Sequence, residues 1–165
     1  MPGGASVVVR DAGTDDVPAI CAFGATHVPP HYAPLIGVQA AHAQVSRWWT
    51  EEQIRPAVSA GLVVVAEAGS GIVGVGQRGW DGADHVIYKL YVDPRHRGGG
   101  LGPRLIEALE HRLPPDAVRL CVEHFAGNAR AGAFYEREGF TVERTVPSAD
   151  GDDTLDVVWR VRLRT

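Results

Sequence analysis

YVDPRHRGGGLGPRLIEALEHRL, residues 91–113, is the stretch that decides the fold of this chain. It begins at the end of an apolar, strand-like run, HVIYKLYV (85–92), and it ends in a run whose leucines recur every four residues, as on one face of a helix. Gly98, Gly99 and Gly100 stand between the two runs, where a helix should begin, although glycine is a poor helix former. The stretch therefore predicts a strand and a helix joined by a bare turn.

Such a turn is suited to binding a phosphate. The first amides of a helix have no partner within the helix and point outward with the positive end of its dipole, and glycine lets phosphate oxygens approach the backbone. Arg97 and Arg104 add positive charge beside it. The alternative is a glycine-rich connection that binds nothing.

Two common phosphate-binding motifs do not fit. A P-loop needs GxxxxGK followed by Ser or Thr, but the one lysine, Lys89, lies upstream of the glycines. A dinucleotide-binding fold needs GxGxxG after an early strand in repeated strand–helix–strand units, and no such repeat is visible.

Outward from this stretch, the pattern predicts a mixed α/β protein. Proline is expected to break VPPHYAPLIG (28–37) into a loop, and Gly-Ser-Gly (69–71) is expected to turn a hairpin. Strands are predicted at 6–10, 62–66, 72–75, 85–92, 117–125, 140–146 and 154–163, and helices at 13–27, 38–60, 101–113 and 128–138.

Composition narrows the function. With 165 residues, 45% of them hydrophobic and 22% charged, the chain is expected to be a single soluble domain over 1–165. A net charge of -4 argues against general nucleic-acid binding, and no apolar run approaches the ~20 residues that cross a membrane. The first ten residues lack the pattern of a secretory signal, and Cys21 and Cys121 form no paired motif. A cytoplasmic protein with reduced thiols is therefore expected.

The fourth predicted strand has an irregular pattern. Ile87, Leu90 and Val92 are its aliphatic positions, and strict alternation fails between Ile87 and Leu90. A one-residue bulge would put all three on one face. The alternative is a strand buried on both faces, with Tyr88 and Tyr91 in the core.

Two motifs resemble those of the GNAT N-acetyltransferase superfamily. LYVDPRHRGGGLGPRLIEAL (90–109) is similar to its acetyl-CoA-binding signature, and NARAGAFYEREGF (128–140) is similar to its second signature. The matching positions are Val92, Pro94, Arg97, Gly100 and Gly102 in the first motif, and Asn128, Tyr135, Gly139 and Phe140 in the second. The motifs occur in the family's order, each on the expected element.

The resemblance implies a fold and a cofactor. The fold would be a single GNAT domain: a mixed, mostly antiparallel sheet with flanking helices, whose bulged fourth strand splays from the fifth. Acetyl-CoA would be the co-substrate, with no metal. The implied cofactor-binding residues are Leu90, Tyr91, Val92, Arg97, Gly98, Gly99, Gly100, Leu101, Gly102, Asn128 and Tyr135.

The resemblance also implies direct attack of an amine on the acetyl thioester. The Val92 amide would stabilise charge on the carbonyl oxygen, and Tyr135 would donate a proton to the leaving thiolate, unless Tyr135 is only a core residue. Many family members use a strand glutamate as base. The fourth strand has none, so Glu123 is the first choice and His85 the second, the alternative being that both are merely solvated.

The acceptor site is expected between His27 and Trp49, where aromatic residues and histidines gather. Tyr32 and one of Trp48 or Trp49 are predicted to hold an amine with an apolar or aromatic portion, while the other tryptophan packs in the core. His27 and His31 have the spacing of a helical zinc pair, but the prolines between them argue against a helix there, and no metal is expected.

The predicted function is acetyl transfer from acetyl-CoA to the primary amine of a small molecule, by a monomer or homodimer without nucleic-acid or membrane partners. One alternative is acetylation of protein N-termini or lysines. The other is a non-catalytic acyl-CoA-binding sensor.

Overall fold

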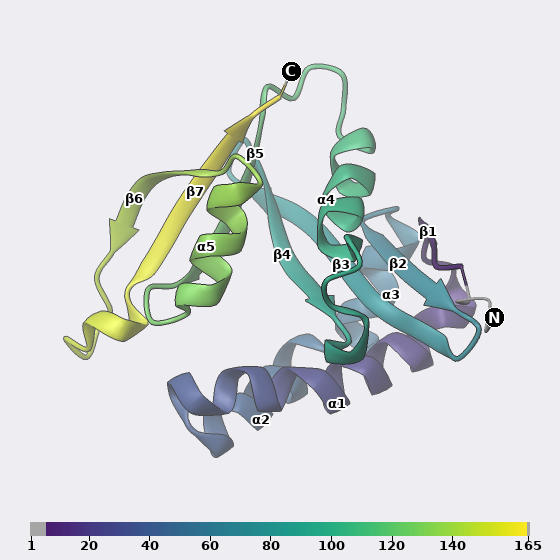
Figure 1. Ribbon diagram of the computed structural model, residues 1–165, viewed down its shortest axis with the longest axis horizontal. Coiled ribbons are helices and arrows are strands. Elements are labelled where there is room, and N and C mark those ends of the chain that lie inside the picture. The colour runs from purple at the N-terminus through teal and green to yellow at the C-terminus, as the bar shows by residue number, and fades with distance from the viewer. Residues whose placement is uncertain (1–5, 165) are drawn as a thin grey trace. The chain divides into compact units, whose positions relative to one another are not determined.

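The computed structural model describes residues 6–164, which form an α/β fold (Figure 1). Its strands are β1 (Val8–Asp11), β2 (Val63–Ala68), β3 (Gly71–Asp81), β4 (Asp84–Val92), β5 (Arg119–Phe125), β6 (Thr141–Val146) and β7 (Val157–Leu163). Its helices are α1 (Val17–Ile36), α2 (Val38–Trp48), α3 (Glu51–Ser59), α4 (Leu101–His111) and α5 (Ala129–Arg137). The predicted strands, and the helices on either side of the fifth strand, are confirmed.

The strands form one mixed sheet in the order β1-β2-β3-β4-β5-β7-β6. β4 and β5 are parallel, with His85 opposite Leu120 and Ile87 opposite Val122. The β2–β3 hairpin is antiparallel, as the glycine-rich turn predicted, and β7 runs antiparallel to both β5 and β6. The mixed sheet with flanking helices confirms the predicted fold class.

Two compact units divide the chain, and each is described separately. The first comprises the chain up to Gln77 together with Lys89–Arg112, and the second comprises Arg78–Tyr88 and the chain from Leu113 onward. β3 and β4 each contribute residues to both units.

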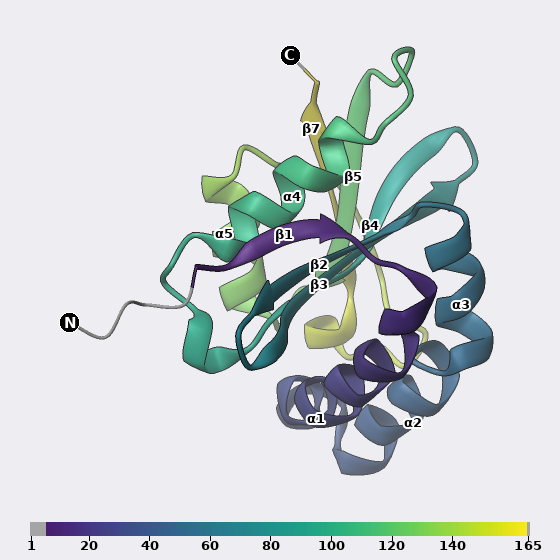
Figure 2. The same ribbon diagram turned by 90° about the vertical axis from the view of Figure 1, so that its right-hand side faces the viewer.

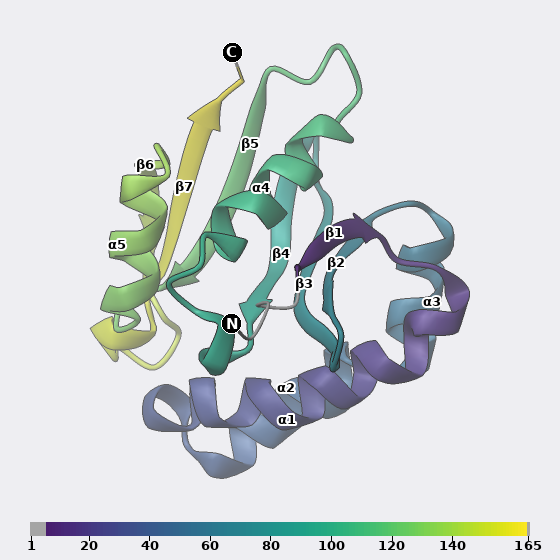
Figure 3. The ribbon, with the colours of Figure 1, turned by 45° about the vertical axis from the view of Figure 1, so that its right-hand side comes forward.

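In the first unit, helices cover both faces of the strands (Figure 3). Val63, Val65 and Val75 pack with residues of α1 and α3 in one apolar cluster. The alternate positions Gly74 and Gly76 face α4, because a Cβ there would lie 3.2 Å from Leu105 Cδ1 and 3.1 Å from Leu109 Cδ1, respectively. The small residues of β3 thus let α4 approach closely.

The loop predicted at 28–37 is wrong, because α1 continues through it as a helix of 20 residues and lies beside α2 (Figure 2). Proline has no N–H, so positions 29, 30 and 34 give no helical hydrogen bond to the carbonyls of Ala25, Thr26 and Pro30. Buried packing at Val28 and Pro29 holds the helix in spite of this loss. In the described residues, no helix has both the length and the apolar character needed to cross a membrane.

The single helix predicted at 38–60 is also wrong. Thr50 begins a new helix, its hydroxyl accepting a hydrogen bond from the Gln53 amide at 3.4 Å, and Trp49 ends the preceding one. The break turns the buried side chain of Trp49, 4% exposed, away from its neighbour Trp48, which is 41% exposed.

In the second unit, α5 packs on strands β5 and β7 (Figure 1). The side chains of Tyr135 and Phe140 meet edge to face with ring centroids 5.7 Å apart, and Phe140 is fully buried. Val86, Cys121, Trp159 and Val161 form a separate apolar cluster.

The consecutive residues Val86 and Ile87 are both buried, which shows that β4 is covered on both faces at that point. Tyr88, by contrast, is 46% exposed. Tyr91 packs against the apolar cluster of the first unit that contains Val63, Val65 and Val75. The bulge in β4 and its separation from β5 stay predictions.

Candidate active site

The glycine turn presents an open backbone between β4 and α4. Gly98 and Gly100 have φ angles of 83° and 78°, the left-handed region that favours glycine. A Cβ built on either would meet no atom within 4 Å, so no side chain covers the turn there. A bare, helix-initiating backbone of this kind fits the pyrophosphate of a nucleotide cofactor.

Asp93 fixes the start of the turn from within. Its side chain is buried, its amide donates to the Val73 carbonyl at 2.8 Å, and its carboxylate accepts from the amide and the Nη2 of Arg95 at 3.0 and 2.9 Å. The hydrogen bond from Arg95 lowers the pKa of Asp93 to about 2. The turn is therefore shaped by the protein itself.

The two arginines predicted to assist phosphate binding are both exposed beside the turn. Arg104 donates to the carbonyl of Val7, the residue before β1, at 3.0 Å. Arg97 directly precedes Gly98. The part that either arginine plays in phosphate binding stays a prediction.

An aromatic cluster, defined as His31, Tyr32, Trp49 and Tyr91, lies in the same unit. The Tyr91 hydroxyl donates to the Tyr32 hydroxyl at 3.0 Å, and the rings of Trp49 and Tyr91 meet at 5.5 Å. His31 packs edge-on against both tyrosines. Two of the predicted acceptor residues, Tyr32 and Trp49, are thus joined through Tyr91, whereas Trp48 lies under the guanidinium of Arg47 at 4.8 Å.

Gly24 makes room for the buried tryptophan. A Cβ at Gly24 would lie 2.3 Å from Trp49 Cε3 and 2.4 Å from Cδ2, far closer than real contacts allow. Glycine to alanine in a helix ordinarily stabilises by about 1 kcal/mol. We expect the opposite sign for Gly24→Ala, a loss of about 1–3 kcal/mol measured by urea unfolding, because the ring must move.

The control for this prediction is Gly13→Ala, since the nearest atom to a Cβ there is Asp16 Oδ2 at 3.8 Å. It should leave stability within about 0.5 kcal/mol of the parent. Adding Trp49→Leu to Gly24→Ala should recover part of the loss. A Gly24→Ala variant as stable as the parent would show that the ring is not confined there.

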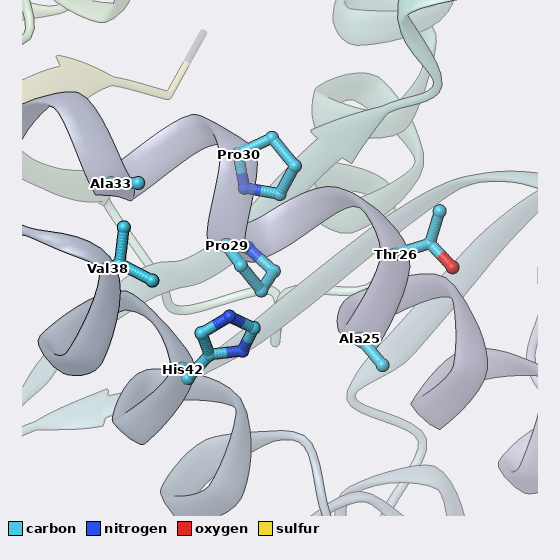
Figure 4. Close-up of a pocket in the computed structure, with 7 residues that line it drawn as sticks. All are labelled: Ala25, Thr26, Pro29, Pro30, Ala33, Val38 and His42. Carbon is cyan, nitrogen blue, oxygen red and sulfur yellow. The ribbon is translucent and has the colours of Figure 1, made fainter.

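A pocket of about 290 Å³ opens between α1 and α2 (Figure 4). Prolines 29 and 30 form one wall and the imidazole of His42 lies opposite. The lining residues are Ala25, Thr26, Pro29, Pro30, Ala33, Val38 and His42. The pocket lies in the segment predicted to contact the acceptor, but none of Tyr32, Trp48 and Trp49 lines it.

His27 and His31 lie in one continuous helix, although the prolines had predicted that the helix would end before His31. His27 Nε2 lies 4.0 Å from the Asp93 carboxylate and its ring packs on Phe23, while His31 belongs to the aromatic cluster. Over residues 6–164, no group of three or more potential ligand side chains is arranged to hold a metal ion.

In the second unit, Tyr135 is only 8% exposed and stacks on His124, with ring centroids 6.0 Å apart. Arg160 Nε donates to His124 Nε2 at 2.9 Å, so His124 Nδ1 carries the proton and donates to the Phe125 carbonyl at 2.9 Å. Burial lowers the pKa of His124, which favours this neutral form. Both ring nitrogens of His124 are therefore engaged in hydrogen bonds while the ring stacks on Tyr135.

The two candidate bases lie apart. Glu123 follows Val122, which is opposite Ile87, whereas His85 is opposite Leu120, about 10 Å away along the strand. The Glu123 residue is exposed on β5, and desolvation by its neighbours together with the nearby Asp81 carboxylate raises its pKa. Such a carboxylate is a stronger base than an ordinary glutamate.

His85 is a weaker candidate than Glu123. Its side chain is 9% exposed, and Arg78 Nη1 donates to its Nδ1 at 3.4 Å. Burial and the Arg78 charge lower the pKa of His85, so the ring resists taking up a proton.

Asn128, one of the predicted cofactor residues, caps α5: its side-chain oxygen accepts a hydrogen bond from the Ala131 amide at 3.2 Å.

Lys89 is the feature that sequence reasoning missed. It directly precedes the predicted cofactor residues of β4, which begin at Leu90, and it is only 7% exposed. The sequence did carry a signal for Lys89, because the single lysine of the chain occurs within a predicted strand of largely apolar residues.

A family model described as "Acetyltransferase (GNAT) domain" matches residues 59–142. Those residues run from the end of α3 into β6 and include the glycine turn and Tyr135. No curated protein matches the sequence.

Solved structures with similar folds share little sequence with this chain. The PaiA N-acetyltransferase from Thermoplasma acidophilum, crystallised with coenzyme A, has a TM-score of 0.81 at 16% identity, over 96% of this chain and 99% of that one. N-acetylglutamate synthase from Neisseria gonorrhoeae gives 0.67 at 18% identity, over 96% of this chain and 35% of that one. The Escherichia coli ribosomal-protein-S18-alanine N-acetyltransferase has a TM-score of 0.62 at 20% identity, over 96% of this chain and 94% of that one. These likenesses establish the fold, while the acceptors named differ between small molecule and protein.

Proposed function

The chain belongs to the GNAT superfamily of acetyl-CoA-dependent acetyltransferases, and we propose that it transfers the acetyl group to the primary amine of a small molecule. The observation that carries the small-molecule acceptor is the aromatic cluster, whose half-buried hydroxyl and imidazole groups lie beside the buried ring of Trp49. Such a mixture of apolar surface and a few polar groups is typical of small-ligand sites. A protein N-terminus or lysine as acceptor is the second candidate.

The glycine turn fits the cofactor, because its uncovered backbone at Gly98 and Gly100 leaves room for a pyrophosphate. We assign cofactor binding to the amides from Arg97 to Gly102 and to β4 from Leu90 to Val92. Acetyl-CoA, when bound, supplies an activated acetyl thioester.

Three groups of the chain are proposed to act on the reaction. The Val92 amide donates a hydrogen bond to the carbonyl oxygen that gains negative charge. The Tyr135 hydroxyl donates a proton to the departing sulfur. Glu123 takes the proton that the neutral acceptor amine gives up as its nitrogen attacks, directly or through water, and its raised pKa supports this role.

The proposal is tested by thiol release from acetyl-CoA over a panel of amines, beside CoA-binding calorimetry. The panel contains amino acids, their amides, aromatic amines, diamines, and peptides with free N-termini or lysines. Turnover with small amines is expected. Turnover confined to peptides would establish the second candidate, and CoA binding without any turnover would point to an acyl-CoA sensor.

The role of Glu123 predicts a specific pH dependence. Its reactive form is the carboxylate, which is lost as the pH falls through its raised pKa, while the acceptor amine becomes reactive only as it loses its own proton. Log kcat/KM should therefore rise with a slope of about 2 below the pKa of Glu123 and about 1 above it.

In Glu123→Gln, the steeper limb should disappear, with kcat/KM lower by about 10²–10⁴. His85→Gln serves as the comparison at the second candidate. If the slope of about 2 in the pH profile of log kcat/KM persists in Glu123→Gln and is lost in His85→Gln, the general base is His85.

We further propose a cytoplasmic location and a monomeric or homodimeric state. Cys21 and Cys121 are both free thiols, which supports a reducing compartment.

A further inference from the structure

Lys89 has an unusual position for a cation. Its side chain is 7% exposed, and its Nζ lies 5.3 Å from the centroid of the Trp49 ring. Within residues 6–164, Nζ makes no hydrogen bond or ion pair. Lysines are almost never buried to this extent without a partner, because removing an ammonium ion from water is costly.

The neighbours of Lys89 belong to the aromatic cluster. Side chains alternate along a strand, so Lys89 and Tyr91 lie on the same face of β4. Trp49 contacts both of them, and Tyr91 connects in turn to Tyr32. Tyr32 and Tyr91 are half-buried, so the cluster runs from the buried ammonium to hydroxyl groups at the surface of the unit.

No carboxylate of this unit neutralises Lys89. The acidic residue nearest in sequence, Asp93, is held by Arg95, and Glu51 of α3 is paired with Arg55 at 3.2 Å. Burial alone lowers the pKa of Lys89, to about 8. The ring of Trp49 stabilises the cation only in part.

We propose that Lys89 binds a carboxylate of the acceptor, so that the acceptor is an amino acid with an apolar or aromatic side chain. This inference rests on the proposed transfer to a small amine and specifies its substrate class. The carboxylate supplies the counter-charge that the buried ammonium lacks, and the rings of Trp49 and Tyr91 pack against the side chain. Diamines are disfavoured, because their second cation would meet the charge of Lys89.

Lys89 is the only lysine of the chain, which allows a direct test of binding without turnover. Protein labelled with ¹³C at the lysine ε-carbon gives one such signal, and its shift from pH 7 to 11 reports the pKa of Lys89. The probes are L-phenylalanine and L-phenylalaninamide, without acetyl-CoA. L-phenylalanine should raise the pKa from about 8 toward the ordinary 10.5, by about one unit or more, and the amide should leave it unchanged.

Kinetics supply the second measurement. Across the amine panel, each amino acid is compared with its amide. In Lys89→Met, which keeps the length and apolar stem, the preference for acid over amide should fall at least about tenfold, mainly through KM. Lys89→Arg should retain part of the preference. Thermal unfolding checks that Lys89→Met is folded, and that variant should be no less stable than the parent because the buried charge is gone.

Several results would overturn the proposal. One is a pKa of Lys89 that no amino acid of the panel raises, whether or not acetyl transfer is seen. Others are an acid-to-amide ratio that Lys89→Met leaves unchanged, or a panel in which amides or diamines are the best acceptors. Acetylation of Lys89 itself, seen by mass spectrometry as one added acetyl group, would assign it a different role. A lack of turnover together with a carboxylate-dependent pKa would refute the transfer reaction but keep the binding site.

Discussion

Replacing Gly100 by valine should abolish CoA binding while the chain stays folded. A Cβ at Gly100 meets nothing within 4 Å in the protein, so the added isopropyl group projects into the space assigned to the pyrophosphate. Losing two amide–phosphate hydrogen bonds, each worth about 1.5–3 kcal/mol, corresponds to at least roughly a hundredfold loss of affinity. Calorimetric titration with CoA measures this loss.

The matched control is Gly61→Val. Gly61 has a φ of 73°, close to the 78° of Gly100, and a Cβ there is equally free of contacts. Both substitutions therefore carry the cost of a left-handed side-chain residue, about 1–2 kcal/mol. Only Gly100→Val should lose CoA binding. Unchanged affinity in a folded Gly100→Val variant would move the cofactor away from the turn.

Tyr135→Phe should lower kcat by about 10²–10⁴ while CoA affinity stays within about threefold of the parent. The phenyl ring preserves the stacking on His124 and the edge contact with Phe140, so the variant removes a hydroxyl and little else. Without that hydroxyl the thiolate must leave without a proton donor. Steady-state kinetics with the best acceptor of the panel measures the effect.

Tyr135→Ala separates chemistry from packing. It removes the ring as well and should destabilise the second unit by about 3–5 kcal/mol, as large-to-small changes in a core do. If Tyr135 is only structural, the phenylalanine variant will keep full activity and only the alanine variant will be damaged. A loss below about threefold in Tyr135→Phe would establish that reading.

Patterns among neighbouring residues in the sequence were sufficient to predict the helix α4 and the glycine turn before it. The leucines of α4 recur at helical spacing, and Leu101, Leu105 and Leu109 are all buried, together with Ile106. The glycines at 98 and 100 indicated a bare turn, and both adopt the left-handed conformation. Such features could be read from the sequence because they depend on neighbours three or four residues away.

Tertiary packing overruled the local rule where prolines were taken as helix breakers. α1 passes through Pro29, Pro30 and Pro34, because buried contacts at Val28 and Pro29 outweigh the lost hydrogen bonds. A rule about single residues cannot anticipate the packing of a helix on a sheet.

The structure alone also decided between Trp48 and Trp49. The sequence placed one of them in the core without saying which. The answer depends on Thr50, which begins a new helix directly after Trp49, and on the space above Gly24. Lys89 is the sharpest case. Its neighbours in sequence predict an ordinary strand. Its burial, however, comes from Trp49, which lies 40 positions away in the sequence. Burial matters because an ammonium ion removed from water gains more from binding an anion than a solvated one does.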